Sequence, residues 1–163
     1  MSLIEPLLAL QEIDTRIAGL KKSIATLPRH KAAREADLST ALRRQLEMEG
    51  ATEAAPSEDA KARLADEIAG IRDELAEVEK RLSEAQDELA SLERRRVESA
   101  AAVPPEHLRF YERLAISHHP TIVRLEGNVC SGCHLTQPPS TAHILRHDTE
   151  FVTCGMCGRM LYL

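Results

Sequence analysis

Apolar residues recur along residues 58–101 in steps that alternate between four and three. The positions are Leu64, Ile68, Ile71, Leu75, Val78, Leu82, Ala85, Leu89 and Leu92. Charged residues, Asp66, Glu67 and Arg72 among them, occupy positions in between. Apolar residues with this spacing line up along one side of a helix and form the seam of a coiled coil. The pattern therefore predicts one long helix that packs against a second helix.

A similar pattern runs through residues 3–48. Its apolar positions are Leu10, Ile13, Ile17, Leu20, Ile24 and Leu27. Pro28 follows and removes one backbone hydrogen-bond donor, so we expect a kink there. Lys31 and Arg34 then stand where apolar residues are due. We expect the seam to continue, packed less tightly, through the next leucines, which are Leu38, Leu42 and Leu46.

Residues 49–57 carry signals for a turn between the two helices. Gly50 favours the end of the first helix, and Ser57 can cap the start of the next. Glu58 and Asp59 suit the first turn of that helix, because carboxylates are favoured at helix N-termini. The two helical stretches have nearly equal lengths, so an antiparallel hairpin within one chain is the simplest arrangement. The alternative is a single continuous helix that pairs between chains, and the chain is accordingly a monomer or a coiled-coil dimer.

The composition changes at residue 102. Pro104 and Pro105 end the long helix, and Pro105 suits the first position of a short new helix. The apolar face of this short helix consists of Leu108, Tyr111 or Phe110, and Leu114. The segment TIVRLEGNV alternates like a strand that ends at the turn pair Gly127-Asn128, and EFVTC and RMLYL are typical of two further short strands. These signals predict a small domain over residues 102–163.

The aromatic residues lie only in this last third of the chain. They are Phe110, Tyr111, Phe151 and Tyr162, and there is no Trp. Since compact cores usually contain bulky rings, residues 1–101 are not an ordinary globule. Phe110 and Tyr111 on the short helix are expected to pack as core, where they fix the base of the hairpin to the small domain. The predicted fold class is therefore mainly α, with a long antiparallel coiled-coil hairpin followed by a small C-terminal domain.

The net charge of −5 lies entirely in the hairpin. Residues 1–101 carry 16 Lys or Arg against 21 Asp or Glu, whereas residues 102–163 carry 5 of each class. A domain that binds nucleic acid usually has a strongly basic surface. The charge pattern therefore lends no support to nucleic-acid binding.

The N-terminal residues 1–14 do not resemble a targeting segment. They have no basic region, and Glu5 and Pro6 interrupt a short apolar run. A signal peptide and a membrane-spanning helix are both excluded by this pattern. We therefore expect a cytoplasmic protein without a membrane partner, in which cysteines stay reduced unless they bind metal or act in catalysis.

Four cysteines carry the clearest chemistry. They are Cys130, Cys133, Cys154 and Cys157, arranged as two C-x2-C pairs with twenty residues between them. Read alone, CSGCH at residues 130–134 is also a c-type haem attachment motif, and either pair is also a redox dithiol motif. Haem would leave the second pair unexplained and needs export, and no βαβ context for a redox motif is readable. The spacing of both pairs favours a zinc ribbon, in which two tight turns supply four thiolates to one Zn²⁺.

The predicted zinc site is structural. Four thiolates complete the coordination shell and leave no position for water or substrate. His134 follows Cys133 where Gly158 follows Cys157, at a position that often needs a left-handed backbone, so we interpret His134 as a turn residue and not as a ligand. A domain of about 60 residues buries too little apolar surface to be stable alone, so metal binding should contribute to its folding.

The remaining candidate residues carry weaker signals. The cluster Arg94, Arg95 and Arg96 lies at the end of the second helix, where cations are favoured. Arg96 falls on the seam and is placed to pair with Glu12 or Asp14 across the hairpin. The cluster is also a candidate partner-binding patch. Four further histidines are expected at the surface: His118, His119, His143 and His147. His30 and His107 lie on the predicted helices and carry no signal.

The chain resembles the bacterial C4-type zinc-ribbon proteins with an N-terminal coiled-coil hairpin. The similarity begins at LLALQEIDTRIAGL and is most specific in PPEHLRFYERL, CSGCHLTQPP and CGMCGRMLY. The resemblance implies a non-enzymatic accessory protein with a structural zinc held by the four cysteines. Members of this family have been linked to the nitrogen-type alternative sigma factor, to flagellar gene expression and, in some cases, to RNA.

The leading functional hypothesis is therefore a zinc-binding adaptor that docks a transcription-related protein, with an alternative sigma factor as the partner that the resemblance suggests. The first alternative is a module that binds RNA or DNA through the ribbon, which the neutral charge of the C-terminal domain makes less favourable. The second alternative is a thiol-disulfide oxidoreductase.

Overall fold

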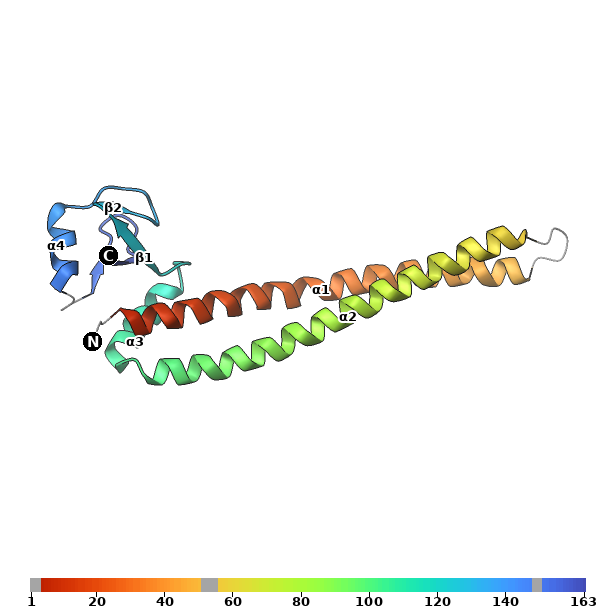
Figure 1. Ribbon diagram of the computed structural model, residues 1–163, viewed down its shortest axis with the longest axis horizontal. Coiled ribbons are helices and arrows are strands. Elements are labelled where there is room, and N and C mark those ends of the chain that lie inside the picture. Colours follow the sequence, from red (N-terminus) through yellow and green to blue (C-terminus); the bar gives the residue numbers. More distant parts are fainter. Residues whose placement is uncertain (1–3, 51–55, 148–150) are drawn as a thin grey trace. The chain divides into compact units, whose positions relative to one another are not determined.

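The computed structural model describes residues 4–50, 56–147 and 151–163 and is mainly helical, as predicted (Figure 1). In chain order its elements are α1 (Glu5–Glu49), α2 (Glu58–Ala101), α3 (Pro105–Ala115), β1 (Ile122–Glu126), β2 (Val129–Cys130), α4 (Pro139–His147), β3 (Val152–Thr153) and β4 (Met160–Tyr162). The two long helices, the short helix after the prolines and the strands β1, β3 and β4 were predicted. Strand β2 and helix α4 were not predicted.

The chain forms two compact units. Unit 1 contains residues 1–19 and 90–163, and unit 2 contains residues 20–89. The predicted boundary between residues 1–101 and 102–163 follows the composition of the chain, whereas these units follow its contacts. The start of α1 and the end of α2 therefore belong to the same unit as the C-terminal residues.

The predicted turn between the helices lies partly outside the described residues, at 51–55. On either side of these residues, Gly50 and Ser57 end and begin the helices as predicted. α1 ends at Glu49, and the N–H of Gly50 donates to the Leu46 carbonyl at 3.0 Å. Ser57 caps α2 by accepting a hydrogen bond from the N–H of Ala60 at 3.2 Å. The alternative of one continuous helix is therefore wrong.

Unit 2 is held together by the predicted seam of α2. Leu64, Ile68 and Ile71 are buried in one cluster with Ala41 of α1. Partly buried apolar residues pack around this cluster: Leu38, Leu42, Met48 and Leu75. The heptad pattern read from residues 58–101 is therefore the packing face of the helix.

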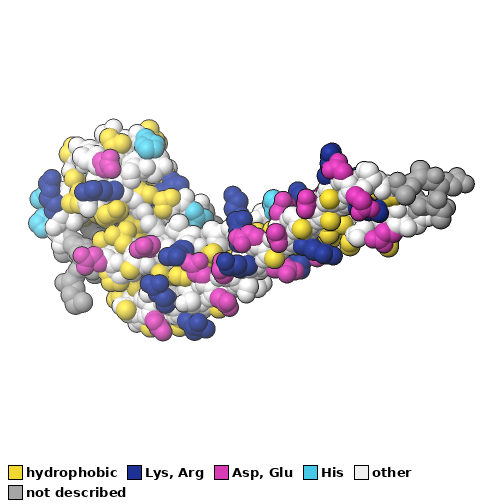
Figure 2. Space-filling model, turned by 45° about the vertical axis from the view of Figure 1, so that its right-hand side comes forward, with side chains coloured by type: hydrophobic (Ala, Val, Ile, Leu, Met, Phe, Trp, Pro, Cys, Tyr) yellow, Lys and Arg dark blue, Asp and Glu magenta, His cyan; other side chains and the backbone are white. Residues whose placement is uncertain are grey.

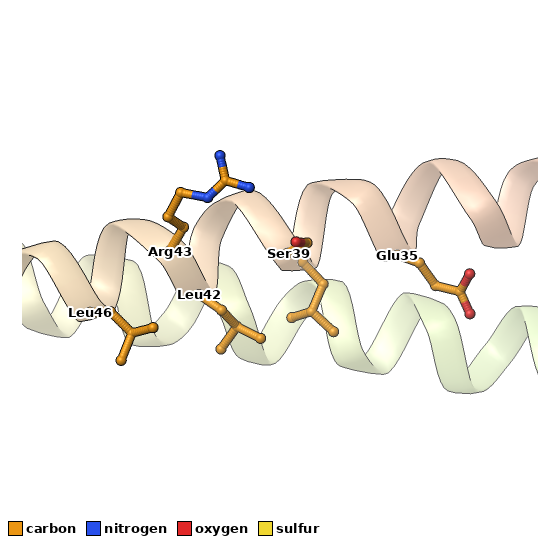
Figure 3. A pocket seen from close by; sticks show the side chains of 6 residues that line it. Glu35, Ser39, Leu42, Arg43 and Leu46 are labelled. Atoms are coloured by element: carbon orange, nitrogen blue, oxygen red, sulfur yellow. The ribbon is translucent and has the colours of Figure 1, made fainter.

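The seam of α1 takes a different course beyond Leu38 from the one we expected. The alternation of three and four residues continues through Ala41, which is 1% exposed, and Met48, which packs against the cluster. Leu42 lies beside the seam and is only partly buried, and Leu46 is 69% exposed (Figure 3). The prediction followed the larger side chains, but a helix keeps its period, so Ala41 faces the partner helix.

Lys31 and Arg34 interrupt the apolar seam and form ion pairs with α2 instead. The Lys31 Nζ lies 2.7 Å from a carboxylate oxygen of Glu79, and an Arg34 nitrogen lies 3.4 Å from one of Glu74. Farther along, Arg44 lies 3.8 Å from Glu67. In these three ion pairs, a higher residue number on α1 is matched by a lower residue number on α2. The two helices are therefore antiparallel within this unit. On the face shown in Figure 2, positively and negatively charged side chains are intermixed along the helices.

The core of unit 1 joins segments from both ends of the chain. Leu7 and Leu10 of α1 are fully buried with Tyr111 of α3, Ile122 of β1 and Met160 of β4. The other three aromatic rings pack against this core: Phe110, as predicted, together with Phe151 and Tyr162. The rings therefore fix the start of α1 to the C-terminal residues of the same unit.

Four short strands form one sheet with the order β2-β1-β4-β3. β1 pairs with β2 and β4 pairs with β3 in antiparallel hairpins. The two hairpins join through a parallel pairing of β1 with β4, in which Ile122 lies opposite Met160. This pairing places the two cysteine-bearing segments in one sheet. Among the described residues, no helix is both long and apolar enough to cross a membrane.

Candidate metal centre

The first pair of cysteines lies at the end of the β1–β2 hairpin. Cys130 is the last residue of β2, and Cys133 lies in the turn that follows it. A bridge between Val129 and Thr136 closes this turn. The resulting tight loop, residues 130–135, is called the first knuckle below.

The second pair lies in the loop between β3 and β4. Cys154 directly follows β3, and two residues separate Cys157 from the start of β4. We call residues 154–159 the second knuckle. Because β3 pairs with β4, the loop that carries these cysteines is closed on both sides.

The two knuckles share one pattern of backbone hydrogen bonds. In the first, the N–H of His134 donates to the Cys130 carbonyl at 2.8 Å, and the N–H of Cys130 donates to Leu135 at 3.1 Å. In the second, the N–H of Gly158 donates to Cys154 at 2.9 Å, and that of Cys154 donates to Arg159 at 2.8 Å. The equal spacing in sequence therefore produces two equivalent turns.

The residue after the second cysteine of each knuckle has a left-handed backbone. The φ angle is 59° at His134 and 74° at Gly158. Glycine adopts this conformation freely and other residues do so at a cost. The His134 side chain is exposed and does not belong to the cysteine cluster. The interpretation of His134 as a turn residue is therefore consistent with its position.

The four cysteine sulfurs meet at one point between the knuckles. All four Sγ atoms lie within 4.8 Å of one another. Cys130 and Cys157 are 3.9 Å apart at sulfur, and Cys133 and Cys154 are 3.6 Å apart. A disulfide requires about 2.05 Å, so these are free thiols. The cluster can hold one metal ion.

The surroundings of the thiols favour a bound cation. Burial by itself raises the pKa of Cys157, but the backbone N–H and the side chain of Arg159 donate to its sulfur and lower the pKa to about 6. The N–H of Leu135 stabilises the Cys133 thiolate, yet burial and the neighbouring thiols raise its pKa to about 12. The raised pKa of Cys133 opposes its thiolate form in the absence of metal, and a bound metal cation would stabilise that form.

Gln137 joins the two knuckles and was not singled out from the sequence. Its side chain is 4% exposed, and its amide oxygen accepts a hydrogen bond from the N–H of Gly155 at 3.1 Å. The backbone N–H of Gln137 donates to the Asn128 carbonyl at 2.7 Å. A polar residue in a loop gives no periodic signal, so only its burial identifies this role.

Arg159 supports the cluster from outside. Its Nε donates to the Pro120 carbonyl at 3.0 Å, and its side chain passes over Gly132 of the first knuckle. A Cβ at Gly132 would lie 2.8 Å from the Cδ of Arg159, so the absence of a side chain there allows this close approach. The Arg159 side chain thus contacts both knuckles, at the Cys157 sulfur of the second and at Gly132 of the first.

The three arginines of the predicted patch differ in their contacts and exposure. Arg96 lies on the seam and donates to Asp14, with 2.6 Å between Nε and Oδ1, as one of the two predicted pairings. It also lies 3.5 Å from Glu112. Arg94 and Arg95 are exposed. Partner binding by this cluster stays a prediction, with Arg94 and Arg95 as the accessible members.

The other histidines of the C-terminal segment lie at or near the surface. His119, His143 and His147 are exposed, as predicted. His118 is half-buried, and its Nδ1 lies 2.8 Å from the Ser117 hydroxyl. None of them belongs to the cysteine cluster among the described residues.

No protein-family model matches the chain, and no curated protein matches it. Among solved structures, the HP0958 protein of Helicobacter pylori is similar over 98% of this chain and 87% of its own, with 16% identity and a TM-score of 0.47. CT398 of Chlamydia trachomatis is similar over 98% and 85%, with 20% identity and a TM-score of 0.42. A protein of Mycobacterium smegmatis is similar over 98% and 84%, with 19% identity and a TM-score of 0.38. These values describe a remote likeness.

Proposed function

We propose that the four cysteines hold one structural Zn²⁺ and that the chain is a non-enzymatic adaptor. The observation that carries the metal assignment is the sulfur cluster. Tetrahedral zinc with bonds of about 2.3 Å to sulfur sets its ligands roughly 3.8 Å apart. The two sulfur pairs, at 3.6 and 3.9 Å, lie on either side of this value.

The donor set supports zinc and a structural role. Four thiolates are a common ligand set for structural zinc, and they leave no position open for substrate. A bound ion would cross-link the two knuckles, which otherwise meet mainly through short strands and Gln137. This geometry also opposes the haem alternative, because Cys130 and Cys133 belong to the same cluster as the second pair and His134 points to solvent.

The test of the metal site is metal analysis of the purified full chain. We expect about one zinc per chain, released only by denaturation or strong chelation. After chelation, the tyrosine fluorescence of unit 1 should change, while most of the helical circular dichroism remains. A chain that keeps its fold with four titratable thiols and no metal would refute the zinc assignment and revive the oxidoreductase alternative.

The adaptor part of the proposal concerns a protein partner. The resemblance noted above suggests the nitrogen-type alternative sigma factor. Each knuckle exposes one large apolar side chain, Leu135 at 45% and Met156 at 68%. Exposed apolar residues of this kind are typical of the centre of a protein interface, and Arg94 and Arg95 add accessible positive charge.

A direct binding assay tests the partner. The purified full chain is titrated with the purified sigma factor of the source organism, and we expect a saturable complex. Leu135→Asp with Met156→Asp should weaken it, whereas Lys80→Asp, on an exposed position of α2, should not. Saturable binding of RNA or DNA at moderate salt, with no sigma-factor complex, would instead favour the nucleic-acid alternative.

A further inference from the structure

Two histidines on α4 lie outside the cysteine cluster and next to each other. The imidazole rings of His143 and His147 have centroids 4.8 Å apart and planes at 81°. They stand four residues apart, which places them one above the other on one face of a helix. Both side chains are exposed.

Helix α4 is fixed in place by its opposite face. Thr141 and Ala142 are buried, and Ala142 belongs to the same core cluster as Cys130 and Cys154. A histidine pair on an anchored helix is held at nearly constant spacing, in contrast to a pair on a loop. The pair therefore does not need to be assembled when a ligand arrives.

The ring nitrogens of this pair are available. Apart from their contact with each other, the side chains of His143 and His147 have no hydrogen-bond or ion-pair partner within residues 4–50, 56–147 and 151–163. His147 also lies in the last turn of α4, where the helix dipole favours a cation, and His143 lies one turn before it. Arg146 lies in the same last turn, and its positive charge opposes this effect.

We propose that His143 and His147 form a second metal site, which chelates a divalent transition ion such as Ni²⁺, Cu²⁺ or Zn²⁺. Imidazole is a preferred ligand of these ions. Histidines at i and i+4 on one helical face are the spacing with which helices chelate zinc. Two protein ligands leave the remaining coordination positions to water or to a group from another molecule, so this ion exchanges readily, unlike one enclosed by four thiolates.

The site can be tested with Ni²⁺ and the full chain after its cysteines have been loaded with zinc. Titration calorimetry should show one Ni²⁺ bound per chain, while a chromogenic chelator reports no release of zinc. His143→Ala and His147→Ala should each weaken Ni²⁺ binding roughly tenfold or more, because each removes the chelate. Alanine favours helix, so circular dichroism should show α4 intact in both variants.

His119→Ala and His134→Ala are the matched controls, since both residues are exposed in the same unit but neither belongs to a pair. They should leave Ni²⁺ binding unchanged. Equal Ni²⁺ affinity in the parent chain and in the two α4 variants would overturn the proposal, as would loss of binding in the controls. Nickel bound to cysteines is told apart by its sulfur-to-metal absorption and by zinc release, so failure of the zinc assignment gives a different result from failure of this one.

Discussion

The side-chain amide of Gln11 on α1 forms two hydrogen bonds with the backbone of Ile122 on β1. Its Nε2 donates to the Ile122 carbonyl at 3.0 Å, and its Oε1 accepts from the Ile122 N–H at 2.6 Å. The two residues are 111 positions apart in the chain. The amide therefore forms hydrogen bonds with both backbone polar groups of Ile122, as a neighbouring strand would.

Replacement of Gln11 by Met should destabilise unit 1. The side chain keeps a similar size, but the N–H and carbonyl of Ile122 lose their partners, which costs about 2 kcal/mol. Both tyrosines of the chain, Tyr111 and Tyr162, lie in this unit, so tyrosine fluorescence in a urea titration measures the effect. Gln86→Met on the exposed face of α2 is the control and should change the midpoint little. Equal midpoints for the two variants would contradict the role of the amide.

Tyr111 should make stability depend on pH in the alkaline range. Burial raises its pKa, and the carboxylate of Asp14, which accepts its hydroxyl at 3.1 Å, raises it further. The unfolded chain loses this proton near pH 10, while the folded chain keeps it to higher pH. The stabilisation is therefore complete below about pH 10 and falls above it by at most about 1.4 kcal/mol per pH unit.

Tyr111→Phe isolates this contribution. The variant should be about 1 kcal/mol less stable at neutral pH because the hydrogen bond to Asp14 is lost. Its free energy of unfolding should then fall less steeply than that of the parent chain above about pH 10. Urea titrations by circular dichroism at several pH values measure both slopes, and parallel curves would show that Tyr111 titrates normally.

Lys31→Leu should stabilise unit 2. Lys31 occupies an apolar position of the seam, its side chain is 34% exposed, and its ion pair with Glu79 lies at the surface. Surface ion pairs contribute about 0–1 kcal/mol, whereas a leucine in the seam buries apolar area worth roughly 1–2 kcal/mol. We expect a net gain of about 1 kcal/mol in helical denaturation curves. The same change at the exposed Lys80 should give none, and a loss of stability at Lys31 would mean that the ion pair outweighs burial.

The left-handed knuckle positions should respond to substitution in opposite directions. Gly158→Ala should destabilise the metal centre by about 1 kcal/mol or more, since a Cβ is strained at φ 74°. His134→Gly should relieve strain at the equivalent position and keep the metal. Gly70→Ala, in open space on α2, should instead stabilise its helix by about 1 kcal/mol. Loss of metal in His134→Gly would identify His134 as a ligand after all.

Cys154→Ser should abolish metal binding and unfold the knuckles while the α1–α2 pair keeps its helicity. A serine hydroxyl is a poor substitute for a thiolate, and removal of a structural metal removes its folding free energy. Met156→Ala, on the exposed side of the same knuckle, is the matched control and should bind metal normally. Metal content and tyrosine fluorescence distinguish the two variants. Full metal content in Cys154→Ser would refute the four-cysteine site.

The sequence by itself determined the features that depend on spacing along the chain. A heptad pattern defines the packing face of α2 because helical geometry converts spacing directly into position. In the same way, two C-x2-C pairs define two turns, and a glycine in the second turn indicates the left-handed residue that His134 matches in the first. These features are local, so one chain segment contains all the information needed for each.

Only the tertiary structure decided which side chains meet across the fold. It placed Ala41 in the seam and left Leu46 in solvent, against the order of their hydrophobicity. It placed the partly buried Gln11 and the buried Gln137 as links between distant backbones, and it formed α4 with its histidine pair. The physical reason is that such contacts depend on the faces and register of elements far apart in sequence. A polar side chain that satisfies a distant backbone group leaves no periodic mark in its own segment.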